Sequence, residues 1–318
     1  MPSRPVELRS PRLYFVWRDY QRRAETLAAR LSADIIYMPN VFRSRWFRPL
    51  DYLIKTIKTF AVIWKRRPSV CIFQAPPLFS VLPVFLLRSP YIVDAHNAIF
   101  QAWWGRLPLS NILARNAERL IVHNEEIQGL ALKQFPDSKI VVLRDPLEHI
   151  SGGGRRSLEK ILFICSFNSD EPFELITTIV KNHPEKKFFL TADKFRLPRA
   201  IRKNLELSSN VVFTGFLPTD QYHALLLSCA ACIVLTNREA SQPSGACEAL
   251  SSDTPLILSK TSLTEKLFGQ WAMLVDNDPE SITQALNQVG PERDLSAFRS
   301  EWEADTAKGL RTLEQVLS

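Results

Sequence analysis

The sequence lacks any long, uninterrupted apolar segment. Residues 1–7 have no apolar core and do not resemble a secretory signal peptide. The most hydrophobic stretch, Val70–Leu87, is interrupted by a glutamine and three prolines, which is typical of a strand followed by a helix. A membrane-spanning helix needs about 20 apolar residues in succession. We therefore expect no transmembrane helix and a cytoplasmic protein, either free or peripheral at the inner face of the membrane.

The sequence also lacks the cysteine pattern of a zinc site or a disulfide-stabilised domain. It has five cysteines, an odd number, and most of them lie inside apolar runs, as buried free thiols do. Cys229 and Cys232 have CxxC spacing, but no second pair or histidine cluster accompanies them. They span the predicted end of a helix and the start of a strand. We interpret them as core residues of a protein in a reducing compartment.

Acidic residues are fewer than basic ones. The 40 Lys and Arg against 33 Asp and Glu give a net charge of +7. This excess favours an anionic partner such as nucleic acid, an anionic membrane or a phosphorylated substrate, although a basic solvated surface explains it equally well. No RRM, KH or helix-turn-helix pattern is present, so we expect no nucleic acid as a partner.

Short apolar runs alternate with longer helical patterns along the chain. Its 318 residues suit two domains of roughly 150 residues each. In the first half we predict strands at residues 13–17, 34–38, 70–74, 91–94, 120–123 and 140–143. This alternation indicates βαβ units and a parallel sheet with helices on both faces.

A glycine cluster separates the two halves. Residues 151–158 contain three glycines in succession, which favour neither strand nor helix, so we interpret them as a linker. Further strands are predicted at residues 160–165, 187–191, 211–214, 231–235, 255–258 and 272–275. The sequence thus predicts an α/β protein with two doubly wound Rossmann-like domains, 1–150 and 159–290, facing each other across a cleft. The C-terminal helix in residues 291–318 is long enough to pack back on the first domain.

The segment Asn237–Glu248 joins an apolar strand to a predicted helix of small residues. A helix start presents free N–H groups and the positive end of the helix dipole to an anion. Ser244, Gly245 and Ala246 have no bulk that would block a phosphate, although Ser244 and Gly245 could equally form an ordinary N-cap. We expect Glu248 in the first turn of this helix, within reach of a ribose diol.

Two charged residues precede this helix. Arg238 offers a planar fork for a phosphate or a carboxylate. Glu239 is a candidate to accept hydrogen bonds from sugar hydroxyls. A surface salt bridge that contributes little is the alternative interpretation of both residues.

The segment Asn237–Glu248 resembles the donor-binding region of retaining GT-B glycosyltransferases of the GT4 family. There, a Glu, seven residues and a Glu-Ala pair precede a strand that begins with a small residue and proline. Here, Glu248-Ala249 and residues 253–257 correspond. The segment 211–217, together with Tyr222 and the helix that follows, is similar to the base-binding loop, which makes Phe216 and Leu217 donor-binding candidates. Residues 93–97 resemble the family's Asp-x-His segment in the acceptor domain.

The resemblance implies a GT-B fold and the transfer of a hexose from a nucleotide-sugar to a glycan or lipid-linked acceptor, as in polysaccharide biosynthesis. It also implies retention of anomeric configuration, no cofactor and no obligatory metal. The sequence contains no Asp-x-Asp metal-binding pattern, which agrees with the last expectation.

Three positions depart from the family pattern. Eight residues, not seven, separate Glu239 from Glu248. No glycine pair follows the first strand, and no Arg/Lys pair follows the first strand of the second domain, where residues 166–170 stand. The diphosphate charge must then be met elsewhere, and Lys194 and Arg238 are the candidates. An active divergent enzyme and a non-catalytic relative that binds a partner both remain open.

His96 lies beside Asp94 at the end of a predicted strand. It is a candidate to orient the donor phosphate or a sugar hydroxyl, or to move a proton. The alternative is a core histidine paired with Asp94. His123 also lies at a strand end, and we interpret the following Glu125 and Glu126 as caps of the next helix.

Residues 42–68 combine eight basic residues and six aromatic residues with a single acid, Asp51. This composition is typical of an element at a membrane surface and would suit a lipid-linked acceptor. The alternative is an ordinary helix over residues 50–64 whose apolar face lies in the core.

Overall fold

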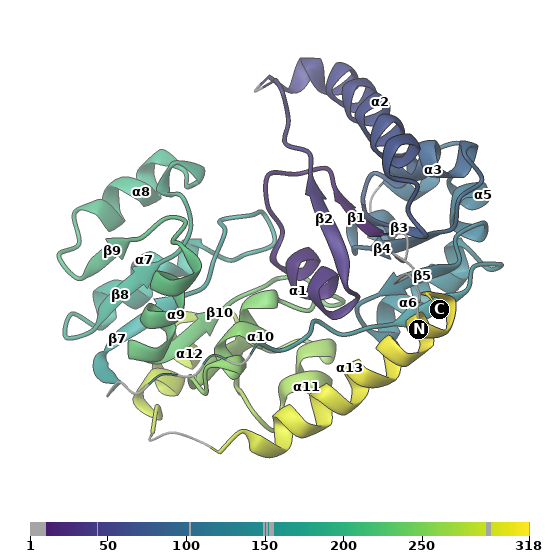
Figure 1. The fold of residues 1–318 in the computed structure, drawn as a ribbon. Helices are drawn as coiled ribbons and strands as arrows, with labels where there is room; N and C mark the ends of the chain where they lie inside the picture. The colour runs from purple at the N-terminus through teal and green to yellow at the C-terminus, as the bar shows by residue number, and fades with distance from the viewer. Residues whose placement is uncertain are drawn as a thin grey trace, which may run out of the picture. The chain divides into compact units, whose positions relative to one another are not determined.

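The computed structural model describes residues 11–42, 44–101, 103–148, 150, 152, 156–290 and 294–317. The chain forms two compact units (Figure 1). Unit 1 comprises Met1–Pro146 and Glu303–Ser318, and unit 2 comprises Leu147–Trp302. Each unit contains a six-stranded sheet.

The sheet of unit 1 is parallel throughout, in the order β2-β1-β3-β4-β5-β6. Its strands are β1 (Arg12–Val16), β2 (Ala33–Tyr37), β3 (Val70–Ala75), β4 (Tyr91–Ala95), β5 (Arg119–Val122) and β6 (Ile140–Val142). The central strands β3 and β4 are buried along their whole length. Burial on both faces explains why these strands read as continuous apolar runs in the sequence rather than as alternating ones.

The helices of unit 1 connect these strands. They are α1 (Arg22–Arg30), α2 (Arg48–Arg66), α3 (Leu82–Leu86), α4 (Ala98–Gln101), α5 (Ser110–Arg115) and α6 (Glu125–Gln134), with 3₁₀ turns at Arg45–Phe47, Leu78–Val81 and Trp103–Arg106. The Asn124 side chain caps α6 by accepting a hydrogen bond from the Ile127 N–H. The prediction that Glu125 and Glu126 act as caps was therefore wrong, because they follow the cap and lie in the first turn.

The long C-terminal helix α13 (Ser296–Leu317) is shared between the units, since Glu303 is the first of its residues that belongs to unit 1. Leu313 and Leu317 join the apolar cluster that α1 and the sheet of unit 1 form. Arg144, which follows β6, pairs with Asp305 at 2.7 Å. A side chain at Gly309 would meet the Val142 carbonyl oxygen at 2.7 Å, so glycine lets the helix approach the strand end closely.

The sheet of unit 2 is also parallel, in the order β12-β11-β10-β7-β8-β9. Its strands are β7 (Ser157–Phe163), β8 (Lys187–Leu190), β9 (Val211–Phe213), β10 (Cys229–Val234), β11 (Leu256–Ser259) and β12 (Met273–Val275). Strand β7 begins inside the predicted linker 151–158. Of that linker, residues 151 and 153–155 lie outside the described residues.

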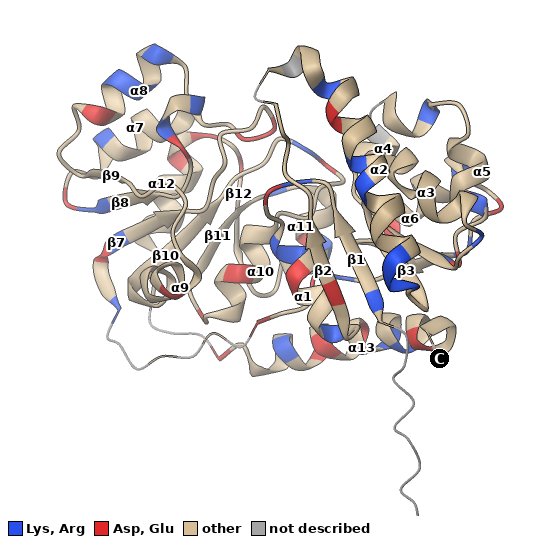
Figure 2. Cartoon of the chain, turned by 45° about the horizontal axis from the view of Figure 1, so that its top comes forward, with Lys and Arg blue, Asp and Glu red and all other residues tan. Residues whose placement is uncertain are grey.

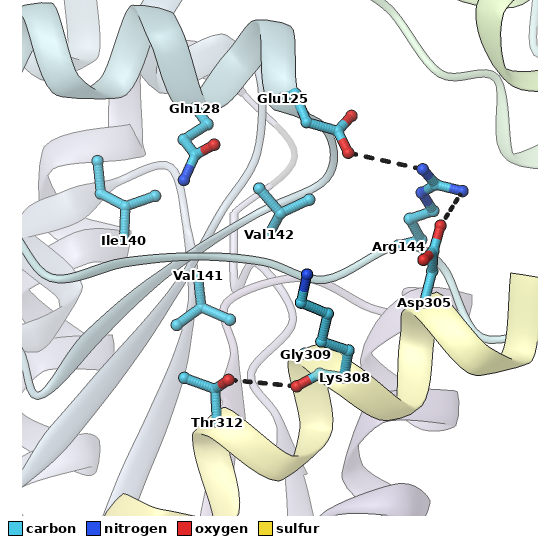
Figure 3. A pocket seen from close by; sticks show the side chains of 10 residues that line it. All are labelled: Glu125, Gln128, Ile140, Val141, Val142, Arg144, Asp305, Lys308, Gly309 and Thr312. Carbon is cyan, nitrogen blue, oxygen red and sulfur yellow. Dashed lines mark hydrogen bonds and ion pairs between the residues drawn. The ribbon is translucent and has the colours of Figure 1, made fainter.

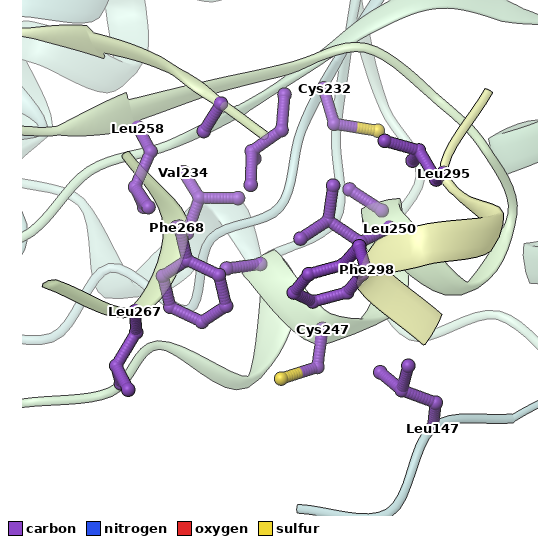
Figure 4. Close-up of a cluster of buried hydrophobic side chains, with 14 of the residues drawn as sticks. Leu147, Cys232, Val234, Cys247, Leu250, Leu258, Leu267, Phe268, Leu295 and Phe298 are labelled. Carbon is purple, nitrogen blue, oxygen red and sulfur yellow. The ribbon is translucent and has the colours of Figure 1, made fainter. Parts of the chain in front are cut away.

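The helices of unit 2 cover both faces of this sheet. They are α7 (Glu174–Asn182), α8 (Arg199–Glu206), α9 (Thr219–Ser228), α10 (Ser244–Ser251), α11 (Ser262–Phe268) and α12 (Pro279–Asn287), with a 3₁₀ turn at Lys194–Arg196. One apolar cluster joins the sheet to α9, α10, α11 and the start of α13 (Figure 4). A second cluster joins the other face to α7, α8 and α12.

Cys229 and Cys232 both lie within β10 and are buried, with their thiols free. The segment lies where a helix ends and a strand starts, as predicted, because Cys229 is the C-cap of α9 and the first residue of β10. Burial raises the pKa of the Cys232 thiol well above its ordinary value. Both cysteines are core residues.

All twelve predicted strands are present, each displaced by at most a few residues. The sequence did not predict the short helices α4 and α11. No helix in the described parts of the chain is long and apolar enough to cross a bilayer.

Candidate functional site

The strand order of unit 2 defines where a ligand would bind. Strands β7 and β10 are neighbours, although β8 and β9 separate them in the sequence. The connections that leave them run in opposite directions along the sheet, and ligands of open α/β sheets generally bind beyond the carboxyl ends of such strands. Residues 164–173 follow β7 and residues 235–243 follow β10. The predicted donor-binding segment thus begins at this switch point.

Helix α10 starts directly after the second of these segments. Its N-cap is Pro243, and no side chain makes a capping hydrogen bond there. Ser244 is exposed in the first helical position, so the alternative that Ser244 caps the helix was wrong. The Ala246 N–H donates to the Pro243 carbonyl oxygen. The first turn therefore presents backbone donors and the positive helix end without a side-chain cap.

Gly245 and Ala246 are buried rather than exposed to a ligand. A Cβ at position 245 would lie 2.8 Å from Ile164 Cγ2 and 3.3 Å from Val234 Cγ2. Glycine is thus required because α10 packs directly on the ends of β7 and β10. The sequence interpretation gave Gly245 the role of leaving room for a phosphate, and the structure adds this packing role.

Glu248 lies in the second turn of α10, because the helix begins at Ser244. The prediction that it lies in the first turn was wrong by about one residue, because the helix begins one residue earlier than predicted. The Tyr222 hydroxyl, on α9, donates a short hydrogen bond to the Glu248 carboxylate. Tyr222 belongs to the segment that resembles a base-binding loop, so the structure brings these two parts of the predicted donor site together.

Arg238 and Glu239 are both exposed in the loop after β10. Arg238 Nε lies 3.8 Å from Asp170 Oδ2, which ties the loop after β10 to the loop after β7. Glu239 accepts hydrogen bonds from the Ser262 backbone N–H at 3.1 Å and from its hydroxyl at 3.4 Å. Ser262 is the first residue of α11, so the Glu239 carboxylate complements the start of that helix.

Lys194 lies in the 3₁₀ turn after β8, and its ammonium group pairs with Glu206 of α8 at 2.8 Å. The neighbouring Arg196 instead reaches the loop after β7, where its guanidinium donates to the Ser166 carbonyl oxygen at 2.8 Å. Sequence reasoning missed Arg196. With Arg238, it is one of two cations that the structure brings to the loop where the family's Arg/Lys pair is missing.

Phe216 and Leu217 follow β9. The Phe216 side chain is 80% exposed, whereas Leu217 is half-buried. Gly215 before them has a φ of +61°, a conformation that favours glycine. The turn thus presents an aromatic ring to solvent at the carboxyl end of the sheet.

Unit 1 contains a second group of polar residues at the carboxyl ends of its strands. Asp94 of β4 is fully buried and accepts a hydrogen bond from the Tyr14 hydroxyl at 2.7 Å. The Arg23 guanidinium of α1 pairs with it at 3.2 Å. His96 Nε2 lies 3.5 Å from Asp94 Oδ2 and 3.0 Å from Gln74 Nε2. The predicted pair Asp94 and His96 is therefore in contact, and Asp94 is itself buried and ion-paired with Arg23.

His123 and Asp145 complete this cluster. The His123 ring packs edge-on against His96, with centroids 4.7 Å apart. Its Nδ1 lies 3.8 Å from Asp145 Oδ1, and its buried Nε2 has no hydrogen-bond partner among the described residues. Arg23 also forms a short ion pair with Asp145, so one guanidinium joins two carboxylates.

The charges of this cluster follow from burial and from Arg23. Burial alone would raise the pKa of the Asp94 carboxyl, but the guanidinium holds that pKa well below its usual range. The same two causes act on Asp145, whose pKa is also lowered. Burial, assisted by Arg23 and His96, lowers the pKa of His123 to about 3. His123 is thus a neutral imidazole beside two ionised carboxylates.

Asp94, His96 and His123 offer ligand atoms that all lie within 4.8 Å of one another. Carboxylate and imidazole suit several transition metals. Arg23 pairs with both Asp94 and Asp145, so its single positive charge offsets only one of the two ionised carboxylates. These charges do not favour an anion over a cation, and the imidazoles suit a hydrogen bond to a hydroxyl group.

A separate pocket of about 330 Å³ lies in unit 1. Residues of α6, β6 and α13 line it (Figure 3), and Arg144 bridges Glu125 and Asp305 at its edge. None of the predicted site residues lines this pocket.

Arg23, Tyr14 and Asp145 were not recognised from the sequence. Arg23 carried one signal: it lies on the same helix face as Ala24, Leu27 and Ala28, where an unpaired charge would be costly. Tyr14 and Asp145 gave no such signal, because only the fold brings them to Asp94.

Comparison with known proteins places unit 2 in a family. Residues 159–290 match the sequence model described as "Glycosyl transferases group 1". No curated protein sequence matches the chain.

Solved structures share the fold of the whole chain at low sequence identity. The sucrose-phosphate synthase of Thermosynechococcus elongatus is 13% identical, with a TM-score of 0.65 and 97% of this chain and 95% of that chain covered. Anabaena HepE, in complex with UDP and glucose, is 11% identical, with a TM-score of 0.66 and coverages of 97% and 98%. The calicheamicin glycosyltransferase CalG4 is 13% identical, with a TM-score of 0.54 and coverages of 97% and 98%. The chain therefore has the GT-B fold, and residues 159–290 of its second unit match the group 1 glycosyl transferases.

Proposed function

We propose that this protein is a glycosyltransferase that moves a hexose from a nucleotide-sugar to a glycan or lipid-linked acceptor. The observation that carries the proposal is the uncapped start of α10 at the switch point of unit 2, with Glu248 and Tyr222 beside it. An uncapped helix start binds phosphate through its backbone N–H groups and its dipole. Anabaena HepE, which shares the fold, was solved with UDP and glucose. A uridine nucleotide is therefore the first donor to test.

In the proposed reaction, the bond between the anomeric carbon and the diphosphate oxygen breaks. A bond from that carbon to an acceptor oxygen forms, the acceptor hydroxyl loses its proton, and a nucleoside diphosphate leaves. The start of α10, Arg238 and Arg196 stabilise the negative charge of the leaving diphosphate. Arg196 takes the place that the sequence interpretation gave to Lys194, because Lys194 is paired with Glu206. We propose retention of configuration, as the family resemblance implies, and no obligatory metal.

In unit 1, the proposal gives His96 the role of orienting a sugar hydroxyl or a donor phosphate. Its neighbours support a fixed ring position, because Gln74 and Asp94 lie on one side of the ring and His123 packs against it. Asp94 acts through His96 and is a positioning residue, since it is fully buried and ionised.

The test is nucleotide binding by isothermal titration calorimetry, with UDP, GDP and ADP and their hexose conjugates. We expect one nucleotide class to bind, and Glu248→Gln and Tyr222→Phe each to weaken that binding about tenfold, as the loss of one hydrogen bond to a charged group does. Glu159→Gln is the matched control, because Glu159 is exposed near the amino end of β7, opposite the proposed site. Equal affinities in all four proteins would contradict the donor-site assignment.

A second candidate is a GT-B relative that binds a nucleotide or a partner without catalysis. The Glu171 carboxylate favours it, because that carboxylate accepts hydrogen bonds from the Ser166 and Phe167 N–H groups, where the family pattern expects a basic pair. Release of nucleoside diphosphate from a nucleotide-sugar, followed by chromatography, separates the two candidates. Turnover that Arg238→Ala abolishes supports the transferase, and binding without turnover supports the second candidate.

A further inference from the structure

The polar face of helix α2 points inward. The helix buries Asp51, Lys55, Thr59 and Ile63, which recur every four residues along one side. Three of these four side chains are polar, which is the reverse of an ordinary surface helix. The sequence interpretation in which the apolar face of this helix lies in the core is therefore wrong.

Hydrogen bonds satisfy most of the buried polar face. Asp51 Oδ1 accepts from the Val41 backbone N–H at 2.8 Å, whereas Asp51 Oδ2 has no hydrogen-bond partner among the described residues. The Lys55 ammonium group donates to the Trp17 carbonyl oxygen at 3.1 Å and to the Asn40 side chain at 2.9 Å. These partners hold the helix in one orientation about its axis, so the outward face is fixed by the fold.

The outward face of α2 is an apolar stripe. It continues from the 3₁₀ turn before the helix and consists of Trp46, Leu50, Leu53, Ile57, Phe60 and Trp64. The spacing of three and four residues puts Leu50, Leu53, Ile57, Phe60 and Trp64 on one side of the helix, and Trp46 precedes them in the 3₁₀ turn. Trp46 is 90% exposed, Ile57 60% and Trp64 64%. A contiguous exposed apolar surface of this kind marks a site of contact with a partner or a membrane.

The exposed charges on α2 and directly after it are basic. Lys58, Lys65, Arg66 and Arg67 are exposed, and Figure 2 shows basic residues along α2 and at its end. Of these, Arg66 pairs with Asp34 of β2 at 3.4 Å. The single acid of residues 42–68 is Asp51, which is buried. Leu86, at the end of the adjacent helix α3, is also exposed. The surface is thus apolar in the centre and cationic at its edge, with a tryptophan at each end.

We propose that the exposed stripe of α2 docks unit 1 on an anionic lipid surface. Aliphatic and phenylalanine side chains enter the headgroup boundary, the tryptophans lie at the interface, and the lysines and arginines pair with lipid phosphates. A second copy of this chain is a poorer occupant, because two cationic edges would repel each other and neither copy offers exposed acids on this helix. The proposal stands on α2 alone and does not depend on the glycosyltransferase assignment.

The test is co-sedimentation of the full chain with vesicles of phosphatidylcholine, with and without 30 mol% phosphatidylglycerol. We expect binding to the anionic vesicles that weakens as salt is added, because screening shortens the reach of the charges. Ile57→Glu should reduce the partition coefficient at least tenfold. Lys58→Gln and Lys65→Gln should each reduce it about fivefold, as each basic residue near the surface contributes about that much. Lys55 is left unchanged, because it is buried in the fold.

Leu207→Glu is the matched control, since Leu207 is a 76% exposed leucine of unit 2 that lies outside the stripe. It should bind vesicles as the wild type does, and thermal unfolding should confirm that all variants are folded. Equal binding by Ile57→Glu and the wild type would overturn the proposal. So would a dimer in sedimentation velocity that Ile57→Glu dissociates, if no vesicle binding accompanies it. Nucleotide affinity, measured in the same variants, should remain unchanged, which separates this test from that of the donor site.

Discussion

The buried imidazole of His123 predicts a specific loss of stability in mild acid. Burial, with Arg23 and His96, lowers its pKa to about 3, whereas an unfolded histidine has a pKa of about 6.5. As the pH falls below about 6.5, the unfolded chain binds a proton at His123 and the folded chain does not. The contribution of His123 to stability is therefore complete above that pH and is lost progressively as the pH falls toward about 3.

The size of the effect follows from the two pKa values. At pH 5 the pH is about 1.5 units below the pKa of an unfolded histidine, and proton binding stabilises the unfolded state by about 1.4 kcal/mol for each unit. The free energy of unfolding is therefore about 2 kcal/mol lower at pH 5 than at pH 7.5. Asp94 and Asp145 have lowered pKa values. They stay ionised in the folded protein between pH 7.5 and 5 and do not contribute to the same change.

Urea unfolding at pH 7.5 and at pH 5, followed by circular dichroism, measures this difference. His123→Gln removes the titrating group, so the difference in unfolding free energy between the two pH values should shrink by about 2 kcal/mol relative to the wild type. His223→Gln, in unit 2, controls for the loss of a histidine elsewhere. If His123→Gln kept the full wild-type difference between pH 7.5 and 5, the assignment of a buried neutral imidazole would be refuted.

Two further predictions concern single residues of each unit. Arg23→Met should destabilise unit 1 by about 3–5 kcal/mol in urea unfolding, because it leaves two buried carboxylates without their cation. Adding Asp94→Asn should recover part of that loss. No recovery in the double variant would argue against the Arg23–Asp94 pair. Gly245→Ala should destabilise unit 2 by about 1–3 kcal/mol, because its Cβ would lie 2.8 Å from Ile164 Cγ2. Gly129→Ala, in the exposed part of α6 with nothing within 4 Å of its Cβ, should instead stabilise the protein by about 0.5–1 kcal/mol. A stabilising effect of both substitutions would contradict the close packing of α10.

The sequence by itself determined the twelve strands and the division into two α/β halves. Hydrophobic runs bounded by turn residues are local signals, and strands buried on both faces make them strong. The sequence also located the strand, the loop and the small-residue helix start that form the proposed donor segment, because all three are contained in consecutive residues.

The tertiary structure alone decided which side chains meet. Arg23, Asp94 and Asp145 are far apart in the sequence, and only the parallel sheet brings their elements together. Lys194 and Arg196 are two residues apart, yet one pairs with Glu206 and the other reaches Ser166. The direction of a side chain depends on the backbone turn that carries it, which composition does not reveal.

Helix α2 shows the same division most clearly. Its sequence contains a polar stripe and an apolar stripe, and periodicity predicts the helix without stating which stripe faces the core. The hydrogen bonds of Asp51 and Lys55 to residues of other segments decide the orientation. Only those long-range partners turned the apolar residues outward, because they satisfy the polar groups that would otherwise be costly to bury.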